Sequence, residues 1–251
     1  MAPRALGAGD LMRIAALSCL YGLTRAIPLF PIVGIQGGSF SAADALAPAL
    51  GLALGPIRAA LAILIGTFIG ISLTGRAPFL GLDFLPAASC AALVGLAAGG
   101  RRSIGLLMLS ALIAAFALSP YSLPLVPIPP LGPGARVPWF WLHLIALALL
   151  ASPAARAFPE WASGGGIPRG LLGAGCLALC GTSAQHLTGC LLFELFYGLL
   201  LGAPPEAFRA IWIPIFWIYP AERLAISAGS ALVIAASSGA LRALGGAGRD
   251  R

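Results

Sequence analysis

The sequence predicts an all-α fold, a polytopic transmembrane bundle of about eight helices, and three observations support this prediction. Of the 251 residues, 59% are hydrophobic and only 9% are charged, with a mean hydropathy of +0.97. The apolar residues fall into long runs that Pro, Gly and Arg interrupt. One run, residues 40–71, carries small residues in rows spaced four apart, which is typical of helices packed closely in lipid. We therefore expect one transmembrane domain over residues 1–251, with a large soluble helical protein as the alternative.

The first three predicted spans lie before residue 74. The first covers about 11–33, and the run 40–71 follows it. As a single helix that run would be about 48 Å long, whereas the hydrocarbon core of a bilayer is roughly 30 Å thick. A break is expected at Gly55-Pro56, because Gly is conformationally permissive and Pro disfavours a helical residue before it. This predicts two short spans joined by a tight turn, the second ending near Leu73.

Five further spans are expected in the rest of the chain. They cover about 84–98, 103–119, 139–151, 170–201 and 208–238. A proline-dense loop is expected at 120–138, and a polar, glycine-rich connection leads to Pro168-Arg169. The span 170–201 would again be about 48 Å long, too long for an upright crossing. It is therefore expected either to unwind between Gly181 and Gly189 or to continue as one tilted helix.

The arginines predict the orientation of the bundle. All 15 basic residues are Arg, and most lie at span ends that share a side with the N-terminus. This positive-inside pattern predicts a multi-pass protein of the plasma membrane with both termini in the cytoplasm. Because the arginines lie in alternate loops rather than along one stripe, the net charge of +7 does not indicate a nucleic-acid partner.

Polar side chains within the spans are the best indicators of a binding site, because each is costly to bury without a partner. The candidate substrate-binding residues are Arg25, Gln36, Asp44, Gln185, His186, Glu194, Glu222 and Arg223. The alternative for the charged residues is a structural ion pair. Arg25 would then pair with Asp44 or Glu222, and Arg223 would pair with Glu194 or Glu222. His186 could equally make a hydrogen bond that only serves packing.

Motifs of known enzymes are missing from the sequence. It contains no HExxH, GxSxG or GxxxxGK[ST] motif, so we expect no enzymatic activity, no cofactor and no ATP binding in this chain. The five cysteines lie inside predicted spans without a converging ligand set, which predicts packing residues rather than a metal site. An intramembrane hydrolase using His186 with Glu194 or Glu222 stays open as an alternative, as does a channel or a purely structural bundle.

The glycines and prolines of the N-terminal part form a pattern that is also found in a known protein family. IAALSCLYGL leads into AIPLFPIVG, and LGLALGP, AALAILIGTFIG and FLGLDFLPAASCAALVGLAAGGR follow. Over about residues 13–102 this pattern resembles the substrate-binding S component of energy-coupling factor (ECF) vitamin transporters. FELFYGLLLG and IWIPIFWIYPAERLAI resemble the last hairpin of that family. S components usually have six helices, so the resemblance implies that residues 103–168 hold an inserted hairpin.

The resemblance also implies a function and partners. An S component captures a small vitamin-like molecule and works with a membrane scaffold subunit and ATPases that are separate chains. It meets the scaffold through small residues four apart on the first helix, where this chain offers Ala15 with Cys19 and Ser18 with Gly22. The alternative is that these four residues pack inside the chain's own bundle. The chain is expected to lie in a lipid bilayer and to bind a small-molecule substrate. Arg25, Glu194 and Arg223 would complement the charges of that substrate.

Overall fold

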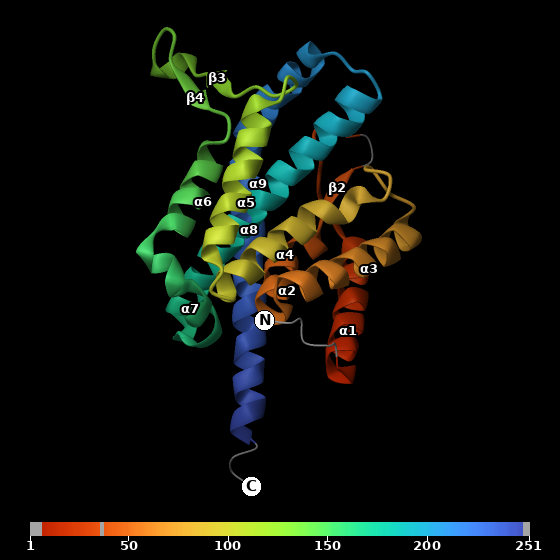
Figure 1. Cartoon of the computed structure of the whole chain (residues 1–251), viewed down its shortest axis with the longest axis vertical. Coiled ribbons are helices and arrows are strands. Elements are labelled where there is room, and N and C mark those ends of the chain that lie inside the picture. Colours follow the sequence, from red (N-terminus) through yellow and green to blue (C-terminus); the bar gives the residue numbers. More distant parts are fainter. Residues whose placement is uncertain (1–6, 36–37, 248–251) are drawn as a thin grey trace.

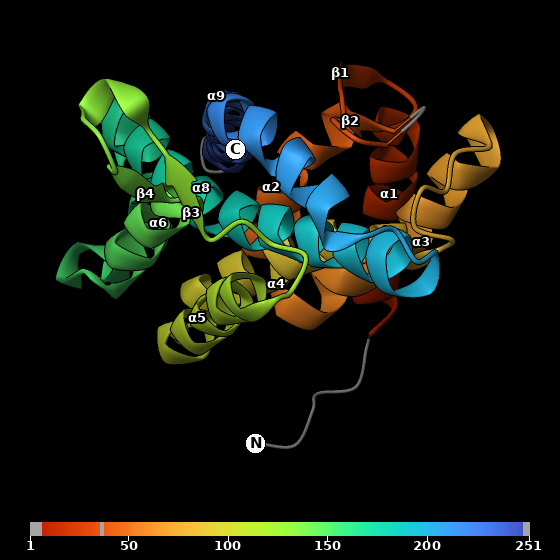
Figure 2. The same ribbon diagram turned by 90° about the horizontal axis from the view of Figure 1, so that it is seen from above.

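The computed structural model describes residues 7–35 and 38–247 and is mostly helical, at 77%. Its α-helices are α1 (Ala8–Arg25), α2 (Ala47–Leu54), α3 (Pro56–Thr74), α4 (Leu85–Ala98), α5 (Arg102–Leu118), α6 (Trp141–Ala151), α7 (Phe158–Gly164), α8 (Gly166–Phe193) and α9 (Pro205–Ala247). Helix α8 is central, because α4, α5, α6, α7 and α9 all pack against it (Figures 1 and 2). Helices α1 and α3 form a pair at one side of this core, joined to it through α2 and α4.

Two helices in the described part of the chain are long and apolar enough to cross a membrane. They are Pro56–Thr74 and Gly166–Leu200, the second consisting of α8 and the π-helical segment that continues it. Helices α4, α5 and α6 are shorter. Helix α2 has eight residues and rises about 12 Å, so it does not by itself cross a hydrocarbon core of roughly 30 Å.

The fold is mostly helical, as the sequence predicts, and two of its connections contain short β-ribbons. Strand β1 (Pro28–Pro31) pairs antiparallel with β2 (Ser39–Ser41), and β3 (Leu125–Pro127) pairs antiparallel with β4 (Arg136–Pro138). Prolines at the strand ends favour extended backbone but remove hydrogen-bond donors, which suits two-stranded ribbons with free edges. The predicted loop 120–138 therefore contains a ribbon, and part of the first predicted span is β1.

The break predicted at Gly55-Pro56 is confirmed. Helix α2 ends at Leu54 and α3 begins at Pro56, with Gly55 at a φ of +76° that favours glycine. The turn also packs tightly, because a Cβ at Gly95 on α4 would lie 2.5 Å from the backbone nitrogen of Pro56. Glycine is therefore required on both sides of this contact.

Small residues let α1 and α3 approach closely. A Cβ at Gly66 would lie 2.5 Å from the carbonyl oxygen of Ser18, and one at Gly22 would lie 2.7 Å from Ile69. Ser18 and Gly22 thus face α3 inside the bundle, whereas Ala15 and Cys19 are exposed on another face of α1. The two rows of small residues on this helix therefore have different surroundings.

Helix α8 is continuous through Gly181–Gly189, so the expected unwinding there is wrong and the continuous helix is the observed alternative. The polar side chains of this stretch bond to the helix itself: Ser183 donates to the carbonyl of Leu179 at 2.7 Å, and Thr188 to that of Ala184 at 2.8 Å. The helical hydrogen-bond pattern changes only later, in the π-helix Glu194–Leu200.

Two elements near the C-terminal half differ from the predicted boundaries. The connection expected after Ala151 contains α7, which packs against α8. Helix α9 is 43 residues long and includes Pro214 and Pro220, so it extends beyond the predicted span 208–238 at both ends. In Figure 1 it runs from the end of the molecule that carries β3 and β4 to the opposite end, where α1 begins.

Candidate functional site

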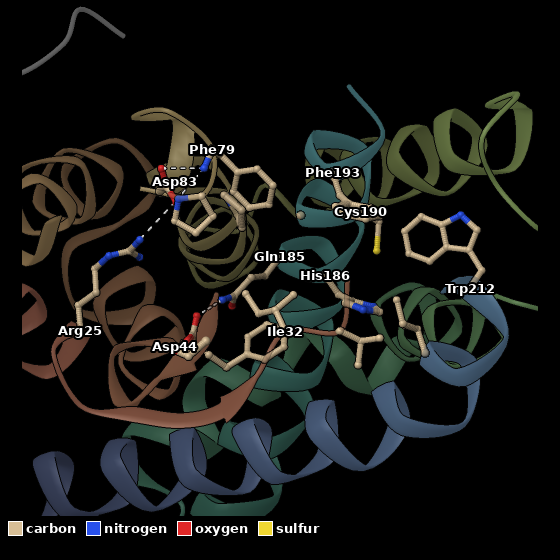
Figure 3. Close-up of a pocket in the computed structure, with 17 residues that line it drawn as sticks. Arg25, Ile32, Asp44, Phe79, Asp83, Gln185, His186, Cys190, Phe193 and Trp212 are labelled. Atoms are coloured by element: carbon tan, nitrogen blue, oxygen red, sulfur yellow. Dashed lines mark hydrogen bonds and ion pairs between the residues drawn. The ribbon is translucent and has the colours of Figure 1, made fainter. Parts of the chain in front are cut away.

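A pocket lies between the β1–β2 ribbon, the start of α4, the second half of α8 and the first half of α9 (Figure 3). It holds about 120 Å³ of free space, roughly ten times what one water molecule requires. Its polar lining residues are Arg25, Ser39, Asp44, Asp83, Gln185, His186 and Cys190, and its larger apolar ones are Ile32, Phe40, Phe79, Phe193, Trp212 and Ile215. We call this space the main pocket.

One face of α8 forms the longest wall of the main pocket. Gln185, His186, Gly189, Cys190 and Phe193 all line it, at the spacing of adjacent turns of one helix face. Because α8 continues unbroken here, these side chains have fixed positions relative to one another. The polar groups that the sequence places in the middle of this span therefore reach the pocket from a regular helix.

A charged pair stands at one edge of the pocket. Arg25 Nη2 lies 3.6 Å from Asp83 Oδ1, so the expected pairing of Arg25 with Asp44 or Glu222 is wrong (Figure 3). Asp83 also accepts hydrogen bonds from the backbone N–H groups of Phe79, at 3.3 Å, and Gly81, at 3.1 Å. The sequence analysis did not single out Asp83; the signal it offered was one acid in the turn between two apolar helices.

Asp44 and Gln185 join the β1–β2 ribbon to α8. Gln185 Nε2 donates to Asp44 Oδ1, and the other oxygen of Asp44 accepts from the backbone N–H of Ser41 at 2.6 Å. The carboxylate requires a donor, so the amide nitrogen of Gln185 points at Asp44 and its oxygen points elsewhere. That Oε1 atom is buried and has no hydrogen-bond partner among the described residues. Gln185 thus lines the main pocket with its amide nitrogen bonded and its amide oxygen without a partner among the described residues.

His186 is backed by a second histidine and by aromatic rings. Its Nδ1 lies 3.2 Å from Nε2 of the fully buried His143, which the sequence analysis passed over. The rings of Trp139 and Tyr219 stack at 5.5 Å and 5.0 Å from that of His186. One histidine of the pair donates and the other accepts, so the tautomer of His143 determines whether His186 presents a donor or an acceptor at its other nitrogen.

The remaining candidates lie outside the main pocket. Glu222 is half-buried and lines a smaller adjoining cavity together with His186 and Phe40. Neither carboxylate oxygen of Glu194 has a hydrogen-bond partner among the described residues, and the same holds for the guanidinium of Arg223. The expected pairing of these two residues is therefore wrong. Gln36 lies outside the described residues.

No protein-family model, curated protein or solved structure matches this chain. The likeness to S components therefore rests on the sequence pattern.

Replacing Asp83 with Asn should lower the stability of the folded protein by about 2 kcal/mol, because it removes the charge partner of Arg25 and weakens the bonds to two backbone amides. Asp10→Asn is the matched control, since Asp10 forms the more exposed pair with Arg58 at 3.0 Å and should cost less than about 1 kcal/mol. Thermal unfolding in detergent compares the two variants. Equal losses would show that Asp83 has no special role at the pocket.

Proposed function

We propose that this chain is the membrane-embedded substrate-capture subunit of an ECF-type importer and binds a small, vitamin-like solute in the main pocket. The observation that carries the proposal is the convergence of polar groups on one pocket from α1, the ribbon, the turn before α4, and α8. The strongest support comes from Gln185 Oε1, which is buried without a hydrogen-bond partner among the described residues. Such an acceptor lowers the stability of the fold unless a ligand supplies a donor.

The proposed membrane arrangement has about eight crossings or part-crossings, with both termini in the cytoplasm. The positive-inside pattern of the arginines supports this orientation. The arrangement of the chain agrees with it, because α1 begins and α9 ends toward one end of the molecule while β3 and β4 lie at the other (Figure 1). In this arrangement the main pocket faces the outside, where an importer meets its substrate.

Ala15 and Cys19 are the proposed contact with a scaffold subunit. Both are exposed, whereas Ser18 and Gly22 already contact α3. A small-residue row left open on an apolar helix suits close approach by a helix of another chain. The scaffold and its ATPases would be separate polypeptides.

Native mass spectrometry of the gently purified full chain tests substrate capture. We expect a retained small molecule in the wild type and a loss of most of it in Gln185→Leu, because leucine removes both the acceptor and the donor to Asp44. Ser110→Leu on the exposed face of α5 is the control and should retain the molecule. No retained molecule in any sample, with no stabilisation by small-metabolite extracts, would contradict the proposal.

The same preparation tests the partnership. Tagged wild-type chain from native membranes should co-purify with ATPases identified by their phosphate-binding loops, and Ala15→Leu should abolish this because added bulk separates the helices. Ala16→Leu, also exposed but on another face of α1, is the control. Wild-type chain that carries no ATPase would contradict the ECF assignment while leaving solute binding standing.

A further inference from the structure

A buried cation without a partner lies next to the main pocket. Arg223, on α9, is fully buried, and none of its three guanidinium nitrogens has a hydrogen-bond partner among the described residues. A guanidinium carries five N–H donors and stays charged in proteins. Burying such a group unpaired is strongly unfavourable, so its presence here calls for a partner that arrives with a ligand.

The guanidinium is in contact with an aromatic ring. Cζ of Arg223 lies 4.6 Å from the centroid of Phe40, which is cation–π geometry. This contact is favourable but leaves the N–H groups without acceptors. Neither Glu222 nor Asp44 forms a salt bridge with Arg223 in the described structure. Asp44 is already engaged by Ser41 and Gln185.

Phe40 contacts both the guanidinium of Arg223 and the main pocket. Its side chain lines the main pocket and also the small adjoining cavity of about 30 Å³ that Glu222 and Ile218 help to line. The Phe40 ring also packs against Phe30 on the paired strand β1, with 5.8 Å between the ring centroids. Arg223 lines neither cavity itself, so Phe40 is the lining residue shown in contact with its guanidinium.

We propose that the solute bound in the main pocket carries a carboxylate, which displaces the ring of Phe40 and pairs with Arg223. The proposal rests on the proposed function and narrows its substrate class. A carboxylate matches the planar fork of a guanidinium and brings one negative charge to one unpaired positive charge. Arg25 is less suited to this role, because Asp83 already neutralises it. The free Oε1 of Gln185 would meet a donor elsewhere on the same molecule.

Thermal unfolding of the full chain in detergent tests the proposal with matched probes at constant ionic strength. The probes are benzoate with benzamide, acetate with acetamide, and inorganic phosphate. We expect at least one carboxylate to raise the melting temperature more than its neutral amide does. In Arg223→Met the apparent affinity for that carboxylate should fall by about tenfold or more, since a buried charge-assisted contact is lost. Arg209→Met, exposed on the same helix, should leave it unchanged.

Two further measurements separate binding from a structural role. Without any probe, Arg223→Met should unfold at or above the wild-type temperature, because it replaces an unpaired buried charge with an apolar side chain. Phe40→Ala should bind the carboxylate more tightly than the wild type, because no ring has to move. A lower melting temperature of ligand-free Arg223→Met would overturn the unpaired assignment.

Other outcomes overturn the proposal without touching solute capture itself. Equal stabilisation by acids and amides, no stabilisation by any probe, or a carboxylate effect that persists in Arg223→Met would each reject Arg223 as the anion site. Stronger Arg223-dependent stabilisation by phosphate would reject the carboxylate. A neutral molecule retained by the purified wild type would leave the proposed function standing and this inference wrong.

Discussion

Replacing Gly51 with Ala should destabilise the protein by more than about 3 kcal/mol, a large effect for the addition of one methyl group. The Cβ would fall well inside contact distance of the Ala91 carbonyl oxygen and 2.9 Å from its Cα, both of which belong to the backbone of α4. A backbone cannot rotate away as a side chain can, so α2 and α4 would have to separate. Close-packed interiors transmit such a shift to their neighbours.

Gly175→Ala is the matched control for this prediction. Gly175 lies in α8, and the nearest atom to its added Cβ is that of Ala231, at 4.0 Å. Alanine is a better helix former than glycine, so this variant should equal the wild type or exceed it by up to about 1 kcal/mol. Unfolding by heat or denaturant in detergent compares the two. Similar losses in both variants would mean that the contact of α2 with α4 is not the constraint.

Replacing Trp139 with Leu should destabilise the protein by about 3 kcal/mol. The indole is fully buried, stacks on Tyr219 at 4.9 Å and donates from Nε1 to the carbonyl of Trp212 at 2.9 Å. Leucine would leave a cavity and remove the second donor to the Trp212 carbonyl, which keeps its bond within α9. Because the ring also stacks on His186, solute binding should weaken together with stability.

Trp217→Leu provides the comparison, because the side chain of Trp217 on α9 is 60% exposed and its loss should cost less than about 1 kcal/mol. Tryptophan removal is thus tested at a buried and an exposed position. Retained binding in Trp139→Leu, or an equal loss of stability in Trp217→Leu, would contradict a supporting role for Trp139.

Helix positions could be predicted where strong local signals bound them. Helices α4 and α5 begin and end within about two residues of the predicted limits, because Gly99-Gly100 breaks the run between them and Pro or Ser closes the outer ends. The turn at Gly55-Pro56 was predictable for the same reason. The helix α7 was not, since its segment FPEWASG lies among glycines and prolines that indicate a loop, and packing against α8 stabilises it.

The sequence predicts several residues of the site but not the residues with which they interact. Polar side chains in apolar spans are rare and therefore indicate a site, and the four that the sequence indicates in this way, Arg25, Asp44, Gln185 and His186, all line the main pocket. Their partners Asp83 and His143 depend on how distant segments meet in space, which no spacing along one helix reports. The same limit applies to Arg223, for which the sequence predicts a pairing with Glu194 and which lies against Phe40 in the structure.

Helix α9 is long enough to connect the main pocket with the opposite end of the molecule. Trp212 and Ile215 touch the main pocket, and Pro220 follows within two turns, where its missing N–H removes a helical hydrogen bond and weakens the rod locally. From Pro220 to Ala247 the helix rises about 40 Å. A change of about 10° in its direction at Pro220 therefore corresponds to a displacement of about 7 Å at the far end of the helix.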